Sequence, residues 1–236
     1  MKRTAIAVRA AMRTILLLLW LPLLAGAQPQ PDPMAQRLRP CTTCHGPEGR
    51  ATNSGYWPRI AGKPAGYLYN QLVHFREGRR RNAAMERLLE PLSDAYLRDI
   101  AAHFGSLELP YPPPQTRAAP AALLERGARL VREGDRSRGI PACNACHGDR
   151  MTGVLPSMPG LVGLPRDYLV AQIGAWRTGN RHAAEPDCMG SVARRLDAAD
   201  IEAVTTWLSA QPTAADMRPA AALPAALPLA CGSGSK

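Results

Sequence analysis

The feature that most constrains this chain is a short motif that occurs twice, as Cys41-Thr-Thr-Cys44-His45 and as Cys143-Asn-Ala-Cys146-His147. Each copy reads C-x-x-C-H, the signature of c-type haem attachment. The two thiols of each copy would form thioether bonds to one porphyrin, and its histidine would bind the iron as an axial ligand. A redox dithiol or half of a zinc site is the alternative for a single C-x-x-C. Because a histidine follows the second cysteine both times, we expect two covalent haem c groups.

The N-terminus has the layout of a secretory signal peptide. Four basic residues accompany the apolar run Ile15–Leu24, and Ala25-Gly26-Ala27 offers a cleavage site. The apolar run has ten residues, whereas a helix needs roughly twenty to span a bilayer. We therefore predict a signal peptide at residues 1–27, cleavage, and a periplasmic location, with an uncleaved membrane anchor as the alternative.

The chain is also an internal duplication. A shift of about one hundred residues brings its two halves into register. The matched positions include Tyr67 and Tyr168, Gln71 and Gln172, Arg76 and Arg177, Gly78 and Gly179, and Met85 and Met189. This agreement predicts two related domains, because two isolated motifs would not share so many positions in order.

A proline-rich stretch separates the halves. Prolines fix φ and lack an amide donor, so residues 109–120 cannot continue a helix and are predicted to form a linker. The first domain is then expected at 28–108 and the second at 121–211. Residues 212–236 are rich in Ala, Pro, Gly and Ser without a helical period, which predicts a flexible C-terminal tail.

Within each half the apolar residues recur with a helical period. Leu68, Leu72 and Phe75 lie on one helix face, and their counterparts repeat the pattern. Ser93 and Asp197 precede later apolar stripes and are expected to cap those helices. No segment alternates convincingly with period two, so each half is predicted to be a small all-α bundle. Aromatic residues make up only 5% of the chain, and a buried porphyrin would add apolar surface to each core.

The second axial ligand decides what each haem can do. An iron with one protein ligand is open to oxygen or peroxide, whereas an iron with two is suited to electron transfer. Met85 and Met189 occupy matching positions in a connection between two helices, so we predict that they are the second ligands. The alternative is that each fills a gap in the core.

Other candidate ligands lack a counterpart of the same type in the repeat. They are Met151, Met158, His74, His103, His182 and Cys188. Cys188 stands out among them, because it adjoins Met189 and a thiolate would lower the haem potential. The repeat nevertheless favours the thioether of Met189.

Several segments together resemble dihaem class I c-type cytochromes, in particular the cytochrome c4 family. They are CTTCHGPEG, PRIAGK, YLYNQLVHFREGRR and LSDAYLRDIAAHF in the first half, and GIPACNACHG, YLVAQIGAWRTGNR and the Met189 region in the second. The resemblance spans roughly residues 37–211 and implies two tandem class I cytochrome c domains, each with one His/Met haem. It also implies haem propionates at the domain interface and proline carbonyls, those of Pro58 and Pro159, that accept a hydrogen bond from the ligand histidines.

The resemblance implies a periplasmic electron carrier rather than an enzyme. Such a protein shuttles electrons from a bc complex or a dehydrogenase to a terminal oxidase, so its partners are redox proteins. The alternative is the cytochrome subunit of a flavoprotein dehydrogenase, for example one that oxidises sulfide. A dihaem peroxidase would need one open iron. The formal charge of +10 overstates the mature protein's basicity, and no basic segment interleaved with aromatics suggests a nucleic-acid partner.

Three features remain open at this level. Arg76, Arg80, Arg177 and Arg181 either lie near the propionates or form solvated turns. The run Arg79–Arg81 leaves open docking to an acidic partner or a peripheral membrane association. Cys188 and Cys231 depart from the family pattern, and a disulfide, two free thiols and an intermolecular bridge are all compatible with the sequence.

Overall fold

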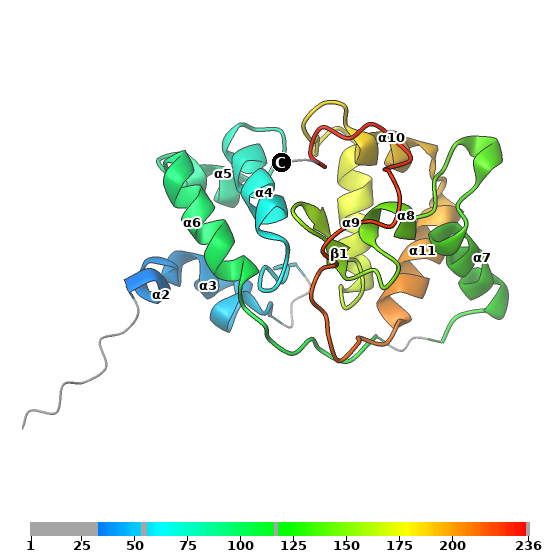
Figure 1. Ribbon diagram of the computed structural model, residues 1–236, viewed down its shortest axis with the longest axis horizontal. Helices are drawn as coiled ribbons and strands as arrows, with labels where there is room; N and C mark the ends of the chain where they lie inside the picture. The colour runs from blue at the N-terminus through cyan, green and yellow to red at the C-terminus, as the bar shows by residue number, and fades with distance from the viewer. Residues whose placement is uncertain (1–32, 53–55, 116–117, 235–236) are drawn as a thin grey trace, which may run out of the picture. The chain divides into compact units, whose positions relative to one another are not determined.

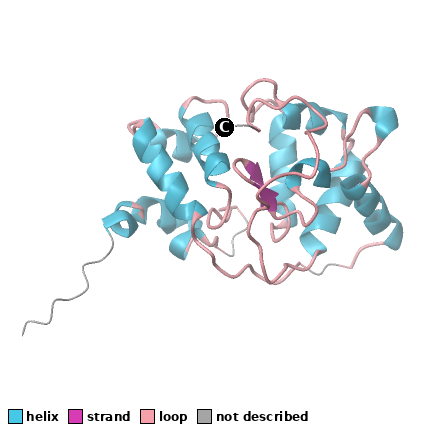
Figure 2. Cartoon of the chain, in the orientation of Figure 1, coloured by secondary structure: helices cyan, strands magenta, loops and turns pink. Residues whose placement is uncertain are grey.

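Helices make up nearly all of the regular structure (Figures 1 and 2). The computed structural model describes residues 33–52, 56–115 and 118–234, so the predicted signal peptide lies outside the described residues. Residues 1–37 and 38–236 form two separate units, and helix α2 (Pro33–Arg37) is the described part of the first. No helix in the described ranges is long and apolar enough to cross a membrane.

In the first half of the second unit, helix α4 packs against two later helices, α5 and α6. The elements of this half are α3 (Arg39–His45), the 3-10 turn η1 (Pro47–Gly49), α4 (Ala65–Arg76), α5 (Ala83–Leu89) and α6 (Asp94–Gly105). Leu68 and Phe75 of α4 are buried, as the periodicity predicts. Leu97, Ile100 and Phe104 of α6 are buried as well, so the predicted stripes form this core.

In the second half, helix α11 packs against both α7 and α9. The elements are α7 (Ala121–Arg132), η2 (Arg136–Arg138), α8 (Asn144–His147), β1 (Gly153–Val154), β2 (Met158–Pro159), α9 (Arg166–Arg177), α10 (Cys188–Arg195) and α11 (Ala198–Ala210). The predicted all-α class is confirmed. The antiparallel pair of two-residue strands, with Val154 opposite Met158, is too short to leave an alternating pattern in the sequence.

Both predicted helix caps are present. The Ser93 hydroxyl accepts a hydrogen bond from the amide of Tyr96 at 3.3 Å. Asp197 and Asp200 form a reciprocal capping box at the start of α11. The buried Asp200 carboxylate also binds Arg138 and Arg126, at 2.6 and 2.7 Å. Burial opposes its charge, but the two guanidinium groups outweigh burial and lower the pKa of Asp200 to about 2.

Residues 109–115 of the predicted linker form neither helix nor strand, and the first half holds them in place. The Arg59 guanidinium donates to the carbonyls of Leu109 and Pro110 at 2.6 and 2.9 Å, and it lies 3.9 Å from the centre of the Tyr111 ring. On the other side, the amide of Gln115 donates to the carbonyl of Ser209 at 3.0 Å. The linker therefore contacts both halves.

The C-terminal segment differs from the sequence-based expectation. Its composition predicts a flexible tail, but residues 212–234 follow a defined course past β1 to α10 (Figure 1, orange to red). Ala220 forms a parallel bridge with Val154, and a disulfide joins Cys231 to Cys188. Backbone hydrogen bonds and a covalent link thus hold a segment that has no helical period of its own.

The contact between α7 and α11 depends on a glycine. A Cβ atom at Gly127 would lie 2.3 Å from the carbonyl oxygen of Ala203 and 2.7 Å from Cβ of Trp207. We predict that Gly127→Ala lowers the free energy of unfolding by roughly 1–3 kcal/mol, because the helices must separate. Urea denaturation followed by circular dichroism measures this change.

Gly174 of α9 is the matched control, because a Cβ atom there meets nothing within 4 Å. Gly174→Ala should raise the free energy of unfolding by up to about 1 kcal/mol, as alanine favours the helix. Equal effects of the two substitutions would contradict the proposed role of close packing at Gly127.

Candidate functional site

Each motif histidine is buried and oriented by a proline carbonyl. His45 ends α3 and His147 ends α8. Their Nδ1 atoms lie 2.8 Å from the oxygen of Pro58 and 2.7 Å from that of Pro159. With Nδ1–H as donor, Nε2 keeps its lone pair free for a metal. Burial lowers the pKa of both histidines, which favours the neutral form that can bind iron. This pair of contacts matches what the resemblance implies.

A glycine after each histidine permits the turn that follows. Gly46 has φ of 78° and Gly148 has φ of 81°, values that disfavour other residues. A Cβ atom at Gly46 would lie 2.3 Å from the carbonyl oxygen of Ala51. The chain can therefore reverse directly behind His45 only with glycine at this position.

The four motif cysteines remain apart from the disulfide, which uses the other two cysteines of the chain. Within each motif the cysteines are three positions apart, so they lie close together at the helical turn that precedes the histidine. Among the described residues, no group of three or more His, Cys, Asp or Glu side chains is arranged to hold a metal ion. A zinc site built from these motifs therefore finds no partner ligands in that part of the chain.

The two methionines lie on short helices of their own, within the predicted connection between two helices. Met85 is in the first turn of α5 and Met189 is in the first turn of α10. Asn82 caps α5 by accepting from the Met85 amide at 3.1 Å, and Asp187 caps α10 by accepting from the Gly190 amide at 2.8 Å. These two cap residues are the signal that would have predicted both helices.

A cavity in the second half brings His147 and Met189 together. Its lining is mostly apolar and includes Cys143, Cys146 and Met158, with Lys63 and His74 contributed by the first half. Trp176 also lines this cavity, and its buried Nε1 has no hydrogen-bond partner among the described residues. A large apolar group with polar substituents, such as a haem with its propionates, fits these walls and would give that N–H an acceptor.

The remaining candidate ligands differ in whether they are free and whether they line the cavity. Cys188 is bound in the disulfide and has no free thiolate. Met151 packs in the core of the second half with Leu130 and Tyr168. His103 stacks edge-on against Phe104 and is not among the residues that line the cavity, whereas His182 does line it.

Two buried arginines lie at the centre of the contact between the halves. Arg80 and Arg181 are 9% and 4% exposed, and their backbones form an antiparallel bridge. The Gln71 oxygen accepts from both guanidinium groups, at 3.0 and 2.9 Å, and the Gln172 oxygen does the same at 2.6 and 2.7 Å. Each arginine thus binds both its own half and the other half.

No carboxylate in the described part of the chain lies within ion-pair distance of either guanidinium group. Nearby groups respond to this positive potential. Burial would raise the pKa of Tyr67, but Arg181, Arg80 and Lys63 outweigh burial and lower that pKa to about 8. Burial lowers the pKa of His74 to about 4, with a further contribution from Arg79, Arg181 and Arg80.

The other two candidate arginines do not join this pair. Arg76 donates to the carbonyl of Leu92 at 2.8 Å and binds Asp94 at 2.5 Å. Arg177 is exposed. The repeat therefore predicts four candidate arginines, and the fold brings two of them together.

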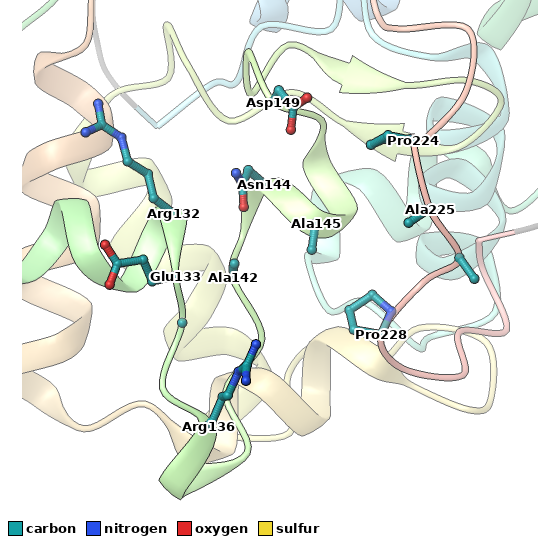
Figure 3. Close-up of a pocket in the computed structure, with 12 residues that line it drawn as sticks. Arg132, Glu133, Arg136, Ala142, Asn144, Ala145, Asp149, Pro224, Ala225 and Pro228 are labelled. Carbon is teal, nitrogen blue, oxygen red and sulfur yellow. The ribbon is translucent and has the colours of Figure 1, made fainter.

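A second hollow, with a volume of about 780 Å³, adjoins the second C-x-x-C-H motif (Figure 3). Asn144 and Ala145 of the motif line it, together with Arg132 and Arg136. Pro224 and Pro228 of the C-terminal segment close its other side. The outer face of the motif is thus bordered by charged residues and by the C-terminal segment.

Comparisons with known proteins agree with this architecture. A thiosulfate dehydrogenase electron acceptor from Thiomonas intermedia is 39% identical over 73% of this chain and 78% of its own length. Cytochrome c4 from Pseudomonas aeruginosa is 32% identical over 71% of this chain and 82% of its own length. No protein-family model matches the chain.

Two solved structures share the fold. Reduced cytochrome c4 from Pseudomonas stutzeri superimposes with a TM-score of 0.63 and 32% identity, over 75% of this chain and 95% of that chain. A thiosulfate dehydrogenase from Marichromatium purpuratum gives a TM-score of 0.62 and 33% identity over 73% of this chain. The match covers 36% of that longer chain. By sequence and by fold, the chain belongs to the cytochrome c4 family of dihaem c-type cytochromes.

Proposed function

We propose that each half holds one haem with two axial side chains, and that the protein carries electrons between redox partners. Bound haem supplies one-electron reduction and oxidation of its iron. The proposed axial ligands are His45 with Met85 and His147 with Met189, and the proposed thioether residues are Cys41, Cys44, Cys143 and Cys146. We also propose that the halves are separate domains, 28–108 and 121–211, on either side of the linker.

The observation that carries this proposal is that His147 and Met189 line one apolar cavity. The proline carbonyl fixes the histidine ring, and the capped start of α10 fixes the methionine. Two side chains held in this way would leave an iron closed to peroxide and little reorganised by electron transfer. The repeat extends the same reasoning to His45 and Met85.

Replacing a ligand methionine by leucine keeps the side-chain volume and removes the sulfur. We predict that Met85→Leu and Met189→Leu each remove about half of the methionine-to-ferric-iron charge-transfer band, because each affects one of two haems. Each variant should also bind carbon monoxide at one ferrous haem. Absorption spectra of the purified holoprotein measure both changes.

Met158→Leu is the matched control, because Met158 lines the same cavity as Met189. It should leave the band intact and the ferrous protein inert to carbon monoxide. If Met158→Leu loses the band and Met189→Leu keeps it, the ligand assignment in the second half is wrong.

The buried arginine pair supports propionate binding at the contact between the halves, since a haem carboxylate there would meet two guanidinium groups that have no carboxylate partner among the described residues. A positive charge near an iron disfavours its ferric state. We predict that Arg181→Gln lowers the haem reduction potentials by an amount on the order of tens of millivolts. The exposed Arg177→Gln should change them far less. Spectroelectrochemical titration measures the potentials, and equal shifts in the two variants would contradict this role.

For the physiological donor, we propose a thiosulfate dehydrogenase. The two relatives named as its electron acceptor, from Thiomonas intermedia and Stutzerimonas stutzeri, are 39% and 37% identical to this chain. The cytochrome c4 relative from Pseudomonas aeruginosa is 32% identical. The predicted N-terminal signal peptide supports a periplasmic location, where electrons would pass on to a terminal oxidase.

Reduction of the ferric holoprotein tests this donor. With thiosulfate and a thiosulfate dehydrogenase present, both haems should become ferrous within seconds, whereas thiosulfate alone should act far more slowly. Parallel reactions contain a quinol-oxidising bc complex or a sulfide-oxidising flavoprotein dehydrogenase. Faster reduction by either of these would replace the proposed donor with that enzyme.

A further inference from the structure

We propose that the C-terminal segment 212–234, here called the strap, positions Met189 and closes the second haem cavity. The proposal rests on the function proposed above, in which Met189 is an axial ligand. The strap makes ligation of the second haem depend on contacts that the first half lacks. Its disulfide partner Cys188 is then a positioning residue that acts through its neighbour in the chain.

Backbone hydrogen bonds fix the first part of the strap beside β1. The amide of Ala220 donates to the carbonyl of Gly153 at 2.9 Å, and the amide of Leu155 donates to the carbonyl of Ala220 at 2.8 Å. The Thr152 hydroxyl donates to the carbonyl of Arg218 at 3.1 Å. This part of the strap therefore continues the small sheet whose other strand contains Met158.

The end of the strap binds the segment that leads into Met189. Cys231 is joined to Cys188, the first residue of α10. The amide of Gly232 donates to the carbonyl of Pro186 at 3.0 Å, and the Ser233 hydroxyl accepts from the amide of Ala184 at 3.2 Å. Three successive strap residues thus hold the chain just before the ligand.

The same residues form part of the cavity wall. Cys231 and Ser233 line the cavity together with His147 and Met189. The carbonyl of Ser233 also accepts from the Ser157 hydroxyl at 2.7 Å and from the Asn70 amide at 3.4 Å. Since Asn70 belongs to α4 of the first half, the strap closes the cavity against both halves.

The repeat provides an internal comparison. Ala84 precedes Met85, where Cys188 precedes Met189, so the first half has no cysteine at this position. Before Met85, Asn82 accepts from the Met85 amide, donates its backbone amide to Glu86 and donates its side-chain amide to the Tyr56 hydroxyl at 3.3 Å. These are hydrogen bonds within the first half, and among the described residues no disulfide holds this segment. A tethered ligand segment loses fewer conformations when the sulfur binds iron, so rebinding is favoured at the second haem.

Gly232 offers a way to displace the strap without changing a cysteine. A Cβ atom there would lie 2.1 Å from the carbonyl oxygen of Glu185, which is too close for a carbon atom. The backbones at residues 185 and 232 would therefore have to move apart. Gly232→Ala should therefore lift the strap from the 184–186 segment. In the double variant Cys188→Ala/Cys231→Ala, alanine at 188 reproduces the residue that precedes Met85.

The test compares the purified holoprotein with both variants and with Met189→Leu. In each strap variant we expect the methionine-to-ferric-iron band to lose up to about half of its intensity. Carbon monoxide binding by the ferrous protein should rise from near zero to about one equivalent per chain. One of the two reduction potentials should fall while the other is unchanged, a readout that a general loss of stability would not produce.

The outcomes test the strap proposal and the ligand assignment separately. If Met189→Leu keeps the full band, the assignment fails and the strap proposal fails with it. If Met189→Leu loses half of the band while both strap variants keep all of it and remain inert to carbon monoxide, only the strap proposal is overturned. Should the cysteine variant not accumulate with haem, opening the disulfide of the folded ferrous protein with a phosphine reductant gives the same carbon monoxide readout.

Discussion

The buried pair of Arg80 and Arg181 is the interaction on which the arrangement of the halves depends. Two guanidinium groups share the oxygens of Gln71 and Gln172 and are removed from water. Burial of like charges is unfavourable unless negative charge is close by. No described carboxylate pairs with them, and the haem propionates that we propose at this contact would supply that charge. The polypeptide and its cofactors would then stabilise each other at the same surface.

The duplication supplies this contact with its symmetry. Matching residues of the two halves bind across the interface as well as within their own half, and the backbones of residues 79–81 and 180–182 pair around it. The two arginines differ in the aromatic ring that each contacts. Arg80 lies over Phe75, whereas Arg181 lies over Trp176, whose indole N–H has no hydrogen-bond partner among the described residues. With the proposed ligands, the two haems would have similar axial side chains and different surroundings.

Much of this structure was predictable from local sequence patterns. The motifs, the helix stripes and the caps at Ser93 and Asp197 all depend on short spacings or on the repeat, whereas the proline carbonyls at Pro58 and Pro159 were implied by the family resemblance. The short helices at Met85 and Met189 were missed, because their caps, Asn82 and Asp187, stand in segments without an apolar period. The flexible tail predicted for residues 212–236 differs from the defined course of residues 212–234. That course is set by contacts with β1 and by one disulfide, and both involve residues distant in sequence. The sharing of Gln71 and Gln172 between two arginines also follows from tertiary packing alone.

The disulfide has a consequence for how this chain matures. Six cysteines must be sorted into two haem-binding pairs and one bridge, although every wrong pairing is chemically available. Cys188 and Cys231 are 43 residues apart, and Cys231 is the last cysteine in the chain. In a chain exported from its N-terminus, both haem motifs emerge before the bridge can close. Both motifs can therefore begin to receive their haems before Cys231 is available to close the bridge to Cys188.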